Sequence, residues 1–377
     1  MKKRVIAINL PQFHPFKEND EWWGKGFTEW TNVTKAKPRF RGHYQPHLPS
    51  DTGFYDLRLP EARQMQADMA KEAGIYGFCY YHYWFNGKRL MNRPIDEILK
   101  SGEPDFPFML CWANENWSRN WDGGFSKILI EQNYSNEDDI NHMKYLCQNV
   151  FCDNRYITVD NKPVFVIYKP QLFPDIKKTI ETWRSIAADF GFQLYICFMH
   201  RSEIDPELYL TKGFDAAIEF QPFCGQYPKW NEGIIPHLHN PLAFLWSKIF
   251  KKNNPFNLIN SYKEYVNHVV KLKMPSYKIY PGITPGWDNS PRRVNSSFTA
   301  FKGSTPELYG KWFANLLRKF DPYSEDENFI FVNAWNEWAE GNHLEPDQRW
   351  GKAFLNETRK QLEIYEKEEL HNCNSSL

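Results

Sequence analysis

Two glutamates lie three residues apart in the segment Asn333-Ala-Trp-Asn-Glu337-Trp-Ala-Glu340-Gly341. The neighbouring Trp335 and Trp338 can raise the pKa of one carboxyl group by removing it from water. Cleavage of a glycosidic bond needs two carboxyl groups of unequal pKa, one acting as acid and the other as base or nucleophile. A solvated loop whose carboxylates cap backbone amides is the alternative, and it leaves the tryptophans unexplained. We therefore take Glu337 and Glu340 as the candidate catalytic pair.

Three further segments combine flat aromatic side chains with amides, acids or imidazole. They are Tyr80-Tyr-His-Tyr-Trp84, Trp112-Ala-Asn-Glu-Asn-Trp117 and Pro285-Gly-Trp-Asp-Asn289. A sugar ring has an apolar C–H face and a rim of hydroxyl groups, so it is complementary to such a surface. Burial explains any single aromatic residue equally well. The recurrence of the combination favours a carbohydrate site.

The elements that must position these residues follow an alternating pattern. Short apolar, β-branched runs alternate with segments of helical period, which is typical of βα units and a parallel sheet. The first turn, Pro11-Gln-Phe-His14, lacks the glycines of a dinucleotide-binding fold. Eight runs predict an α/β fold of the (β/α)8 TIM-barrel type, whose active sites lie at the carboxyl ends of the strands. The expected strands are residues 5–10, 76–83, 106–112, 164–168, 193–198, 216–220, 278–283 and 329–334.

We expect one catalytic domain over residues 1–365, followed by a polar tail at 366–377. The connections 15–56 and 225–261 are too long for plain loops, and we expect both as insertions at the C-terminal face. Within the second, residues 241–252 combine apolar and lysine side chains. They predict a lid helix over the barrel, with weak contact to a membrane surface as the alternative.

Composition excludes several classes of protein. The chain has 46 Lys+Arg against 46 Asp+Glu, so its zero net charge argues against a nucleic-acid partner. Seven cysteines without a repeated pair spacing indicate reduced thiols. The N-terminal apolar run is too short for a signal peptide, and no run has the length of a membrane span, which favours a soluble, cytoplasmic protein. The 15 Trp, 20 Tyr and 29 Phe suit a glycan substrate.

We expect neither a metal nor another cofactor. His43 and His47 are four residues apart, but Pro46 between them prevents the helix that would bring both to one face. No acidic loop has the spacing and central glycine of a calcium site. A phosphate-binding glycine loop and the D-x-D acidic pair of many sugar-nucleotide transferases are also missing from the sequence.

Six long motifs are spread over nearly the whole chain. They are Asn9-Leu-Pro-Gln-Phe-His14-Pro, Asn19-Asp-Glu-Trp-Trp-Gly-Lys-Gly-Phe-Thr-Glu-Trp30, Gly42-His-Tyr-Gln-Pro46, Tyr80-Tyr-His-Tyr-Trp84, Leu110-Cys-Trp-Ala-Asn-Glu-Asn-Trp117 and Trp335-Asn-Glu-Trp-Ala-Glu340-Gly. These motifs resemble the WbsX family, whose members are named as glycosyltransferases of O-antigen and capsular polysaccharide loci. More distantly, the chain is similar to glycoside hydrolase family 99, the endo-α-mannosidases and mannanases, which are (β/α)8 barrels.

The resemblance to the hydrolase family implies a mechanism. Glu337 would act as base on the 2-hydroxyl of the sugar and generate a 1,2-anhydro sugar, while Glu340 would protonate the leaving oxygen and later activate water. The configuration at the sugar carbon would be retained. Glu115 in place of Glu340 is the alternative partner of Glu337. The expected substrate-binding residues are His14, Tyr81, His82, Trp84, Trp112, Asn114, Glu115, Trp117, Trp287, Asp288, Asn336 and Trp338.

The sequence thus predicts a retaining endo-glycosidase or transglycosylase that acts on an oligosaccharide or polysaccharide of the cell surface, including a lipid-linked one. A glycosyltransferase of polysaccharide biosynthesis is the first alternative. The second is a glycan-binding protein without turnover, which would have no need of paired acids.

Overall fold

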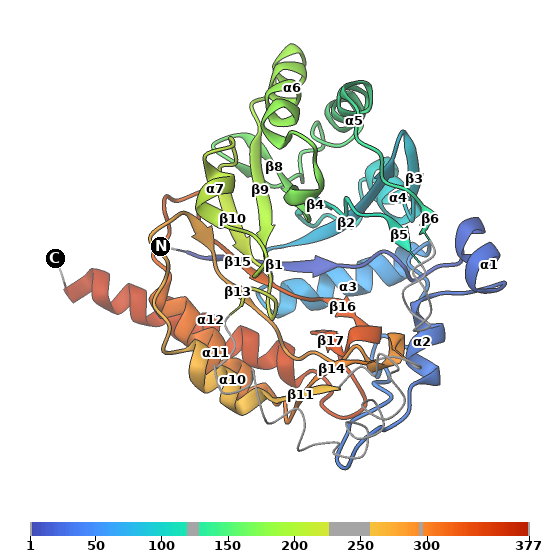
Figure 1. Ribbon diagram of the computed structural model, residues 1–377. Coiled ribbons are helices and arrows are strands. Elements are labelled where there is room, and N and C mark those ends of the chain that lie inside the picture. Colours follow the sequence, from blue (N-terminus) through green and yellow to red (C-terminus); the bar gives the residue numbers. More distant parts are fainter. Residues whose placement is uncertain (1, 119–127, 226–256, 294–296, 376–377) are drawn as a thin grey trace, which may run out of the picture.

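The computed structural model describes residues 2–118, 128–225, 257–293 and 297–375 of the chain. Its main sheet is a ring of parallel strands, with β1 paired to both β2 and β15 (Figure 1). The ring consists of β1 (Arg4–Asn9), β2 (Gly77–Phe85), β4 (Phe108–Trp112), β8 (Lys162–Ile167), β9 (Tyr195–His200), β10 (Ala216–Glu219), β12 (Ile279–Tyr280), β13 (Gly282–Ile283) and β15 (Phe329–Val332). The predicted barrel is confirmed.

The seventh of the eight predicted strands is interrupted at Pro281 and closes the ring in two pieces. β12 pairs with β10 on one side, and β13 pairs with β15 on the other. Gly282 lies so close to β10 that a Cβ atom there would stand 2.0 Å from the backbone oxygen of Glu219. A glycine is therefore required where the two halves of the barrel meet.

Helices surround the barrel (Figure 1). α5 and α6 pack together on one side, and α10, α11 and α12 pack side by side on another. Local sequence explains where they begin: Pro60 and Pro306 open α3 and α11, and the Ser135 hydroxyl accepts a hydrogen bond from Asp138 N at 3.1 Å in α5. The outer helices are α3 (Pro60–Glu72), α4 (Arg93–Ser101), α5 (Asn136–Asn149), α6 (Ile176–Asp189), α7 (Pro206–Leu210), α10 (Tyr262–Val269), α11 (Pro306–Lys319) and α12 (Ala353–Ser375).

The loops at the carboxyl ends of the strands contain short helices and strands. The first insertion contains α1 (Lys17–Trp23) and α2 (Glu29–Lys35). β5 (Trp117–Ser118) and β6 (Ile128–Ile130) form a ladder after β4, and β11 (Leu258–Ser261) pairs with β14 (Thr299–Lys302). The segment with the candidate catalytic glutamates forms a hairpin of β16 (Asn336–Glu337) and β17 (Asn342–His343) around the turn η5 (Trp338–Glu340). The remaining short elements are β3 (Lys88–Leu90), β7 (Thr158–Val159), η2 (Pro170–Leu172) and η4 (Ser290–Arg292).

Two predicted segments at the edge of the domain have different outcomes. Within the predicted polar tail, residues 366–375 are helical and continue α12 as far as Ser375. The predicted lid or membrane segment, 241–252, lies outside the described residues. Within the described ranges, no helix combines the length and the apolar character that crossing a bilayer requires.

The core takes up much of the aromatic content. Among the described residues, five tryptophans are fully buried, namely Trp112, Trp183, Trp312, Trp335 and Trp338. Composition therefore overstates the aromatic surface available to a ligand, because a barrel with an outer layer of helices has a large interface to fill.

Addition of a methyl group at Gly282 tests whether the barrel closes as tightly as described above. We expect Gly282→Ala to lower the free energy of unfolding by about 3 kcal/mol or more, because the backbone of Glu219 cannot move away without opening the sheet. The control is Gly303→Ala, where no atom lies within 4 Å and the cost is the left-handed backbone alone, about 1–2 kcal/mol. Urea denaturation measures both, and equal losses would contradict the tight closure.

Candidate functional site

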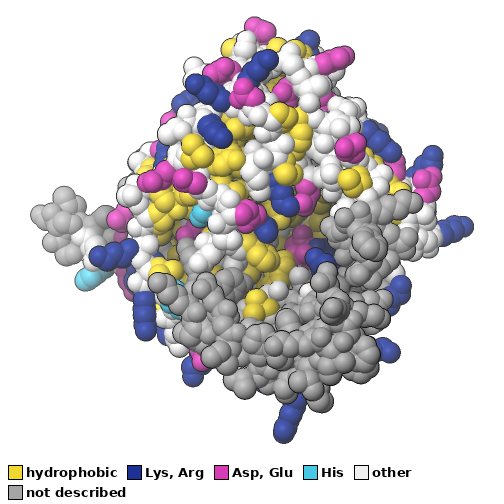
Figure 2. Space-filling view, in the orientation of Figure 1, with side chains coloured by type: hydrophobic (Ala, Val, Ile, Leu, Met, Phe, Trp, Pro, Cys, Tyr) yellow, Lys and Arg dark blue, Asp and Glu magenta, His cyan; other side chains and the backbone are white. Residues whose placement is uncertain are grey.

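A cavity of about 430 Å³ opens at the carboxyl ends of the barrel strands. Figure 2 shows a hollow at the centre of one face, with hydrophobic, basic and acidic side chains around it. The lining includes both candidate catalytic glutamates. The full lining is Leu10, Gln12, Tyr81, Tyr83, Ala113, Glu115, Asn116, Trp117, Ser118, Tyr168, Lys169, Arg201, Phe220, Phe223, Trp287, Asn289, Arg292, Arg293, Glu337 and Glu340.

The guanidinium group of Arg292 joins three carboxylates at the wall of this cavity. Its Nη2 lies 2.7 Å from Glu337 Oε2 and 2.5 Å from Glu29 Oε1, and its Nη1 lies 2.5 Å from Glu340 Oε1. Glu29 opens α2 in the first insertion, whereas Arg292 ends η4 after the seventh strand. Three loops that are distant in sequence therefore meet at one cation.

Burial and this cation act in opposite directions on the two candidate glutamates. Burial raises the pKa of Glu337 to about 8; the Arg292 guanidinium opposes the rise, and the carboxylates of Glu340 and Glu29 add to it. Burial likewise raises the pKa of Glu340, again against Arg292. Burial alone would lower the pKa of Arg292, but the three carboxylates outweigh it and raise that pKa. Because Glu337 and Glu340 interact closely, they titrate as a pair.

Gly341 explains why the motif ends in glycine. Its φ of +55° is left-handed, and a Cβ atom there would stand 2.9 Å from Cβ of Asp288. The same contact brings Asp288 N within 2.5 Å of Glu340 O, as a backbone hydrogen bond. The turn can therefore fold back on the seventh-strand loop and leave the Glu340 side chain at the cavity.

A second carboxylate layer lies beneath the pair. Glu345 is buried, and its oxygens accept hydrogen bonds from the indoles of Trp338 (2.6 Å) and Trp335 (3.0 Å). Tyr55 Oη and Gln66 Nε2 donate to it at 2.8 and 2.7 Å. Burial raises the pKa of Glu345 to about 7, against these four donors. Both tryptophans of the motif are thus held in the core, and Trp338 does not line the cavity.

Six of the predicted residues meet at the cavity: Tyr81, Glu115, Trp117, Trp287, Glu337 and Glu340. Trp117 contacts the ring of Tyr83 edge-on, at 5.3 Å between centroids. Glu115 forms an ion pair with Lys169 and is not one of the three carboxylates that contact Arg292. The structure therefore brings Glu340, and not Glu115, onto the guanidinium that holds Glu337.

Three other predicted residues point away from the cavity, toward the outer helices. Successive side chains of a strand lie on opposite faces, so His82 and Trp84 lie on the face of β2 opposite to Tyr81. His82 Nε2 lies 2.9 Å from Nε2 of His142 in α5, and Trp84 stacks on the same imidazole at 4.5 Å. Trp112 donates its indole N–H to the backbone oxygen of Trp84 at 3.1 Å. We correct their predicted role: they pack the barrel against α5.

Two predicted asparagines hold the loops rather than line the cavity. Asn114 donates to Lys169 O at 2.8 Å and accepts from Lys169 N at 2.7 Å, so it imitates a backbone pairing between two strand ends. Asn336 accepts from Leu10 N at 2.7 Å and donates to Leu10 O at 3.0 Å in the same manner. Both amide groups also donate to side chains, that of Asn114 to Tyr134 Oη and that of Asn336 to Asn9 Oδ1, and neither asparagine lines the cavity.

His14 and Asp288 are also occupied within the protein. His14 Nδ1 lies 3.1 Å from the backbone oxygen of Pro11. Asp288 accepts hydrogen bonds from His43 Nε2 at 2.5 Å and Gln45 Nε2 at 2.7 Å, which ties the first insertion to the seventh-strand loop. Burial would raise the pKa of Asp288, and these donors more than compensate and lower it. Neither residue lines the cavity.

Sequence reasoning missed Arg292 and Glu29, the centre of the cluster. Glu29 belongs to the motif that ends at Trp30, and Arg292 lies three residues beyond Asn289, so both were near a recognised signal. Tyr83 could also have been predicted as a residue of the cavity wall, because it lies on the same face of its strand as Tyr81. Nothing local distinguishes Arg292 from its neighbour Arg293, since only the fold selects the arginine that meets the glutamates.

Removal of the central cation should give a pH-dependent loss of stability. In Arg292→Gln, burial and mutual repulsion hold the carboxyl pKa values above those of the unfolded chain, so stability is lost as the pH rises through them. We expect a loss of about 3–5 kcal/mol at pH 8 and a clearly smaller loss at pH 5.

Urea denaturation at the two pH values measures the effect. The control is Arg318→Gln, which breaks a half-exposed pair with Glu368 (2.8 Å) and should change stability little at either pH. An equal loss at pH 5 and pH 8 in Arg292→Gln would contradict the electrostatic account.

Known proteins resemble this chain in sequence and in fold. Two curated relatives from Xanthomonas campestris pv. campestris, strains B100 and ATCC 33913, are both called uncharacterized protein WxcX. They are 38% identical to this chain over 363 and 361 residues, and the match covers 95% of this chain but 49% of each relative. The chain thus spans about half the length of these relatives.

A solved endo-α-mannosidase of glycoside hydrolase family 99 from Bacteroides thetaiotaomicron has a TM-score of 0.58 at 13% identity, over 97% of this chain and 98% of its own. A glycoside hydrolase-like protein has a TM-score of 0.58 at 14% identity, over 96% and 94% of the two chains. At these identities the likeness establishes the barrel fold. The model of the family described as Glycosyltransferase WbsX matches residues 5–358, and the chain belongs to that family.

Proposed function

We propose that this member of the WbsX family cleaves or transfers glycosidic bonds, with Glu337 and Glu340 as the acid/base pair. The observation that carries the proposal is the placement of both carboxylates on one guanidinium, at the wall of a cavity at the carboxyl ends of the barrel strands. Active sites of barrel enzymes lie at this face. Raised pKa values allow the pair to hold a proton near neutral pH, which one carboxyl donates while the other accepts.

We assign the two glutamates different roles, as the resemblance to glycoside hydrolase family 99 implies. The Glu337 side chain is 7% exposed, and that of Glu340 is 20% exposed. Glu337 removes the proton of the 2-hydroxyl, whose oxygen attacks the adjacent anomeric carbon, while Glu340 gives its proton to the departing glycosidic oxygen. Water, or an acceptor hydroxyl, then opens the three-membered ring after losing a proton to Glu340, and Glu337 returns its proton to O2. Two inversions at one carbon give net retention.

Arg292 suits this exchange as a positioning residue. In each step one glutamate gains a proton while the other loses one, so the total charge of the pair is constant. A guanidinium that contacts both carboxylates therefore compensates the same charge throughout the reaction. Its planar group also fixes the two carboxylates relative to each other.

The remaining lining suits an oligosaccharide or polysaccharide. Tyr81, Tyr83 and Trp117 supply flat surfaces for the apolar faces of sugar rings, and Gln12 and Asn116 supply amide groups for hydroxyls. A volume of about 430 Å³ lies within the range of small-molecule pockets.

A glycosyltransferase that uses an activated donor is the second candidate function. The observation that favours it is a group of cations on the same lining, Lys169, Arg201 and Arg293, in addition to Arg292. Arginine and lysine bind phosphate groups, so these side chains suit a donor with a phosphate leaving group, carried by a nucleotide or by a lipid. In either candidate function, these cationic side chains would also suit the phosphate group of a lipid-linked saccharide.

Substitution of the acids tests the pair. The assay incubates the protein with polysaccharide of its own organism, with and without sugar nucleotides or lipid-phosphate sugars, and follows products by mass spectrometry. Glu337→Gln and Glu340→Gln should each lower turnover by about 10²–10⁴-fold or more, because one proton transfer is lost, while saccharide binding remains. Glu115→Gln is the matched control and should retain activity.

The outcomes separate the candidates. Oligosaccharides released without an activated donor support the glycosidase, and products that require such a donor support the transferase. Full activity in Glu337→Gln would refute the assignment, and loss in Glu115→Gln with full activity in Glu340→Gln would make Glu115 the partner of Glu337.

Two tryptophans test which aromatic residues contact the saccharide. Trp84→Ala should lower the free energy of unfolding by about 3–5 kcal/mol, since it empties the contact with His142, and should leave affinity unchanged. Trp117→Ala should lower saccharide affinity by about tenfold, equivalent to roughly 1.4 kcal/mol, at little cost in stability. Calorimetric titration with oligosaccharide fragments and urea denaturation measure the two effects, and the reverse pattern would contradict the placement of both side chains.

A further inference from the structure

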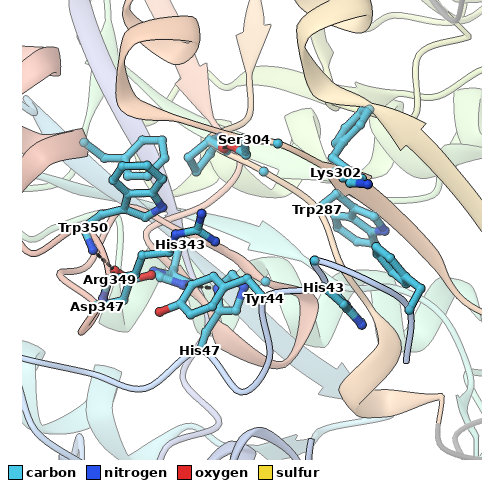
Figure 3. Close-up of a pocket in the computed structure, with 18 residues that line it drawn as sticks. His43, Tyr44, His47, Trp287, Lys302, Ser304, His343, Asp347, Arg349 and Trp350 are labelled. Atoms are coloured by element: carbon cyan, nitrogen blue, oxygen red, sulfur yellow. Dashed lines mark hydrogen bonds between the residues drawn. The ribbon is translucent and has the colours of Figure 1, made fainter. Parts of the chain in front are cut away.

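A second cavity of about 290 Å³ lies beside the first and shares Trp287 with it (Figure 3). The first insertion contributes His47 to its wall, and the segment that follows the catalytic turn contributes His343 and Asp347. Figure 3 shows these three side chains next to one another, on the opposite side of the cavity from His43 and Lys302. None of the three takes part in the reaction proposed above.

The three side chains have the composition of a metal site. One ligand atom from each of His47, His343 and Asp347 lies within 4.8 Å of the other two. His47 Nδ1 and His343 Nε2 are 2.9 Å apart. Ligand atoms on a tetrahedral zinc ion with bonds of about 2.0 Å stand roughly 3.3 Å apart, so small side-chain rotations complete the geometry.

Neighbouring groups hold the ligands in the required state. His343 Nδ1 lies 2.9 Å from the backbone oxygen of Glu345, and because a carbonyl oxygen only accepts, this nitrogen carries the proton. His343 Nε2 therefore presents a lone pair toward His47. Asp347 Oδ1 accepts hydrogen bonds from the backbone amides of Arg349 (3.0 Å) and Trp350 (2.6 Å), which fixes the carboxylate. Such outer partners orient the ligands of natural metal sites.

Two aromatic rings restrict the imidazoles further. Trp338 stacks on His343 at 3.8 Å with an interplanar angle of 12°, and Tyr44 stacks on His47 at 4.2 Å. His343 is 7% exposed and Asp347 is 3% exposed, so an ion held there would be largely shielded from water. Ligands that are already fixed lose little conformational entropy when a metal binds.

We infer that His47, His343 and Asp347 form a binding site for a divalent transition-metal ion of the zinc type. Two imidazoles and one carboxylate favour such an ion over Mg²⁺ or Ca²⁺, which prefer oxygen ligands alone. All three ligands line the cavity, so the ion keeps at least one coordination position open toward it. It would also tie the first insertion to β17 of the catalytic hairpin.

This inference departs from the expectation of no metal, which rested in part on the spacing of His43 and His47. His43 is bound to Asp288, whereas His47 finds a partner 296 residues away. No spacing in the sequence indicates that pair, since His47 belongs to the first insertion and His343 to β17, in the hairpin after the last strand of the barrel.

Zinc titration tests the site without any enzymatic assay. Protein freed of metal with a chelator and exchanged into chelator-free buffer is titrated with Zn²⁺ in competition with a chromophoric chelator. We expect one ion per chain, with weaker binding in Asp347→Asn and His47→Gln by at least about 100-fold, more than the loss of an outer partner costs. Asp347→Asn keeps the oxygen that accepts from the two backbone amides, so it is designed to fold.

The controls distinguish a built site from chance affinity. His268→Gln removes a histidine of α10 far from the cluster along the chain and should bind Zn²⁺ as the unaltered protein does. Mg²⁺ and Ca²⁺ should not compete at equal concentration. If Zn²⁺ binds no more weakly in both cluster variants, or does not bind at one ion per chain, the three residues form a hydrogen-bonded network only and the inference is overturned. Circular dichroism and urea denaturation without metal verify that each variant is folded.

Discussion

The contact of the Arg292 guanidinium with three carboxylates is the interaction on which the site depends. Glu29 comes from the first insertion, Arg292 from the loop after the seventh strand, and Glu337 and Glu340 from the hairpin after the eighth. A buried carboxylate without a charged partner lowers the stability of the fold. Each of the three loops therefore depends on the others for the partner of its charged side chain. The long first insertion is thereby a part of the face that carries the cavity. The same contact brings the two candidate catalytic carboxyl groups to one guanidinium.

Support for this arrangement comes from the polar layer below it. Glu345 is a buried carboxylate, and four neutral side chains donate the hydrogen bonds that water would otherwise supply. Because Trp335 and Trp338 donate to it, the two tryptophans lock the backbone on either side of Glu337. Trp338 also stacks on His343, so the hairpin of β16 and β17, the buried carboxylate and the inferred metal site share one support. Preorganisation of this kind is what electrostatic catalysis requires.

The order of elements along the chain was readable from local pattern, and so was the face at which the site lies. All eight expected runs are strands of the barrel, and the segment 333–341 follows the last of them. The aromatic motifs were harder to read, because each contains residues of both strand faces. Tyr81 lines the cavity while His82 and Trp84 contact His142, a distinction that the period of two predicts once the strand is known. Asn114 and Asn336 were predicted as ligand contacts, whereas in the structure their amides pair with backbone groups, and nothing in the sequence indicates that pairing.

By itself, the sequence determined the barrel, the paired glutamates after its eighth strand and the carbohydrate character of the motifs, because periodicity and residue order are local properties of the chain. Tertiary structure alone decided that Arg292 and Glu29 join those glutamates. It likewise decided which aromatic rings reach the cavity and that His47 lies beside His343 and Asp347. The physical reason is that charges, rings and ligand atoms act over a few ångströms in space, whereas the loops that carry them are brought within that distance only when the barrel closes.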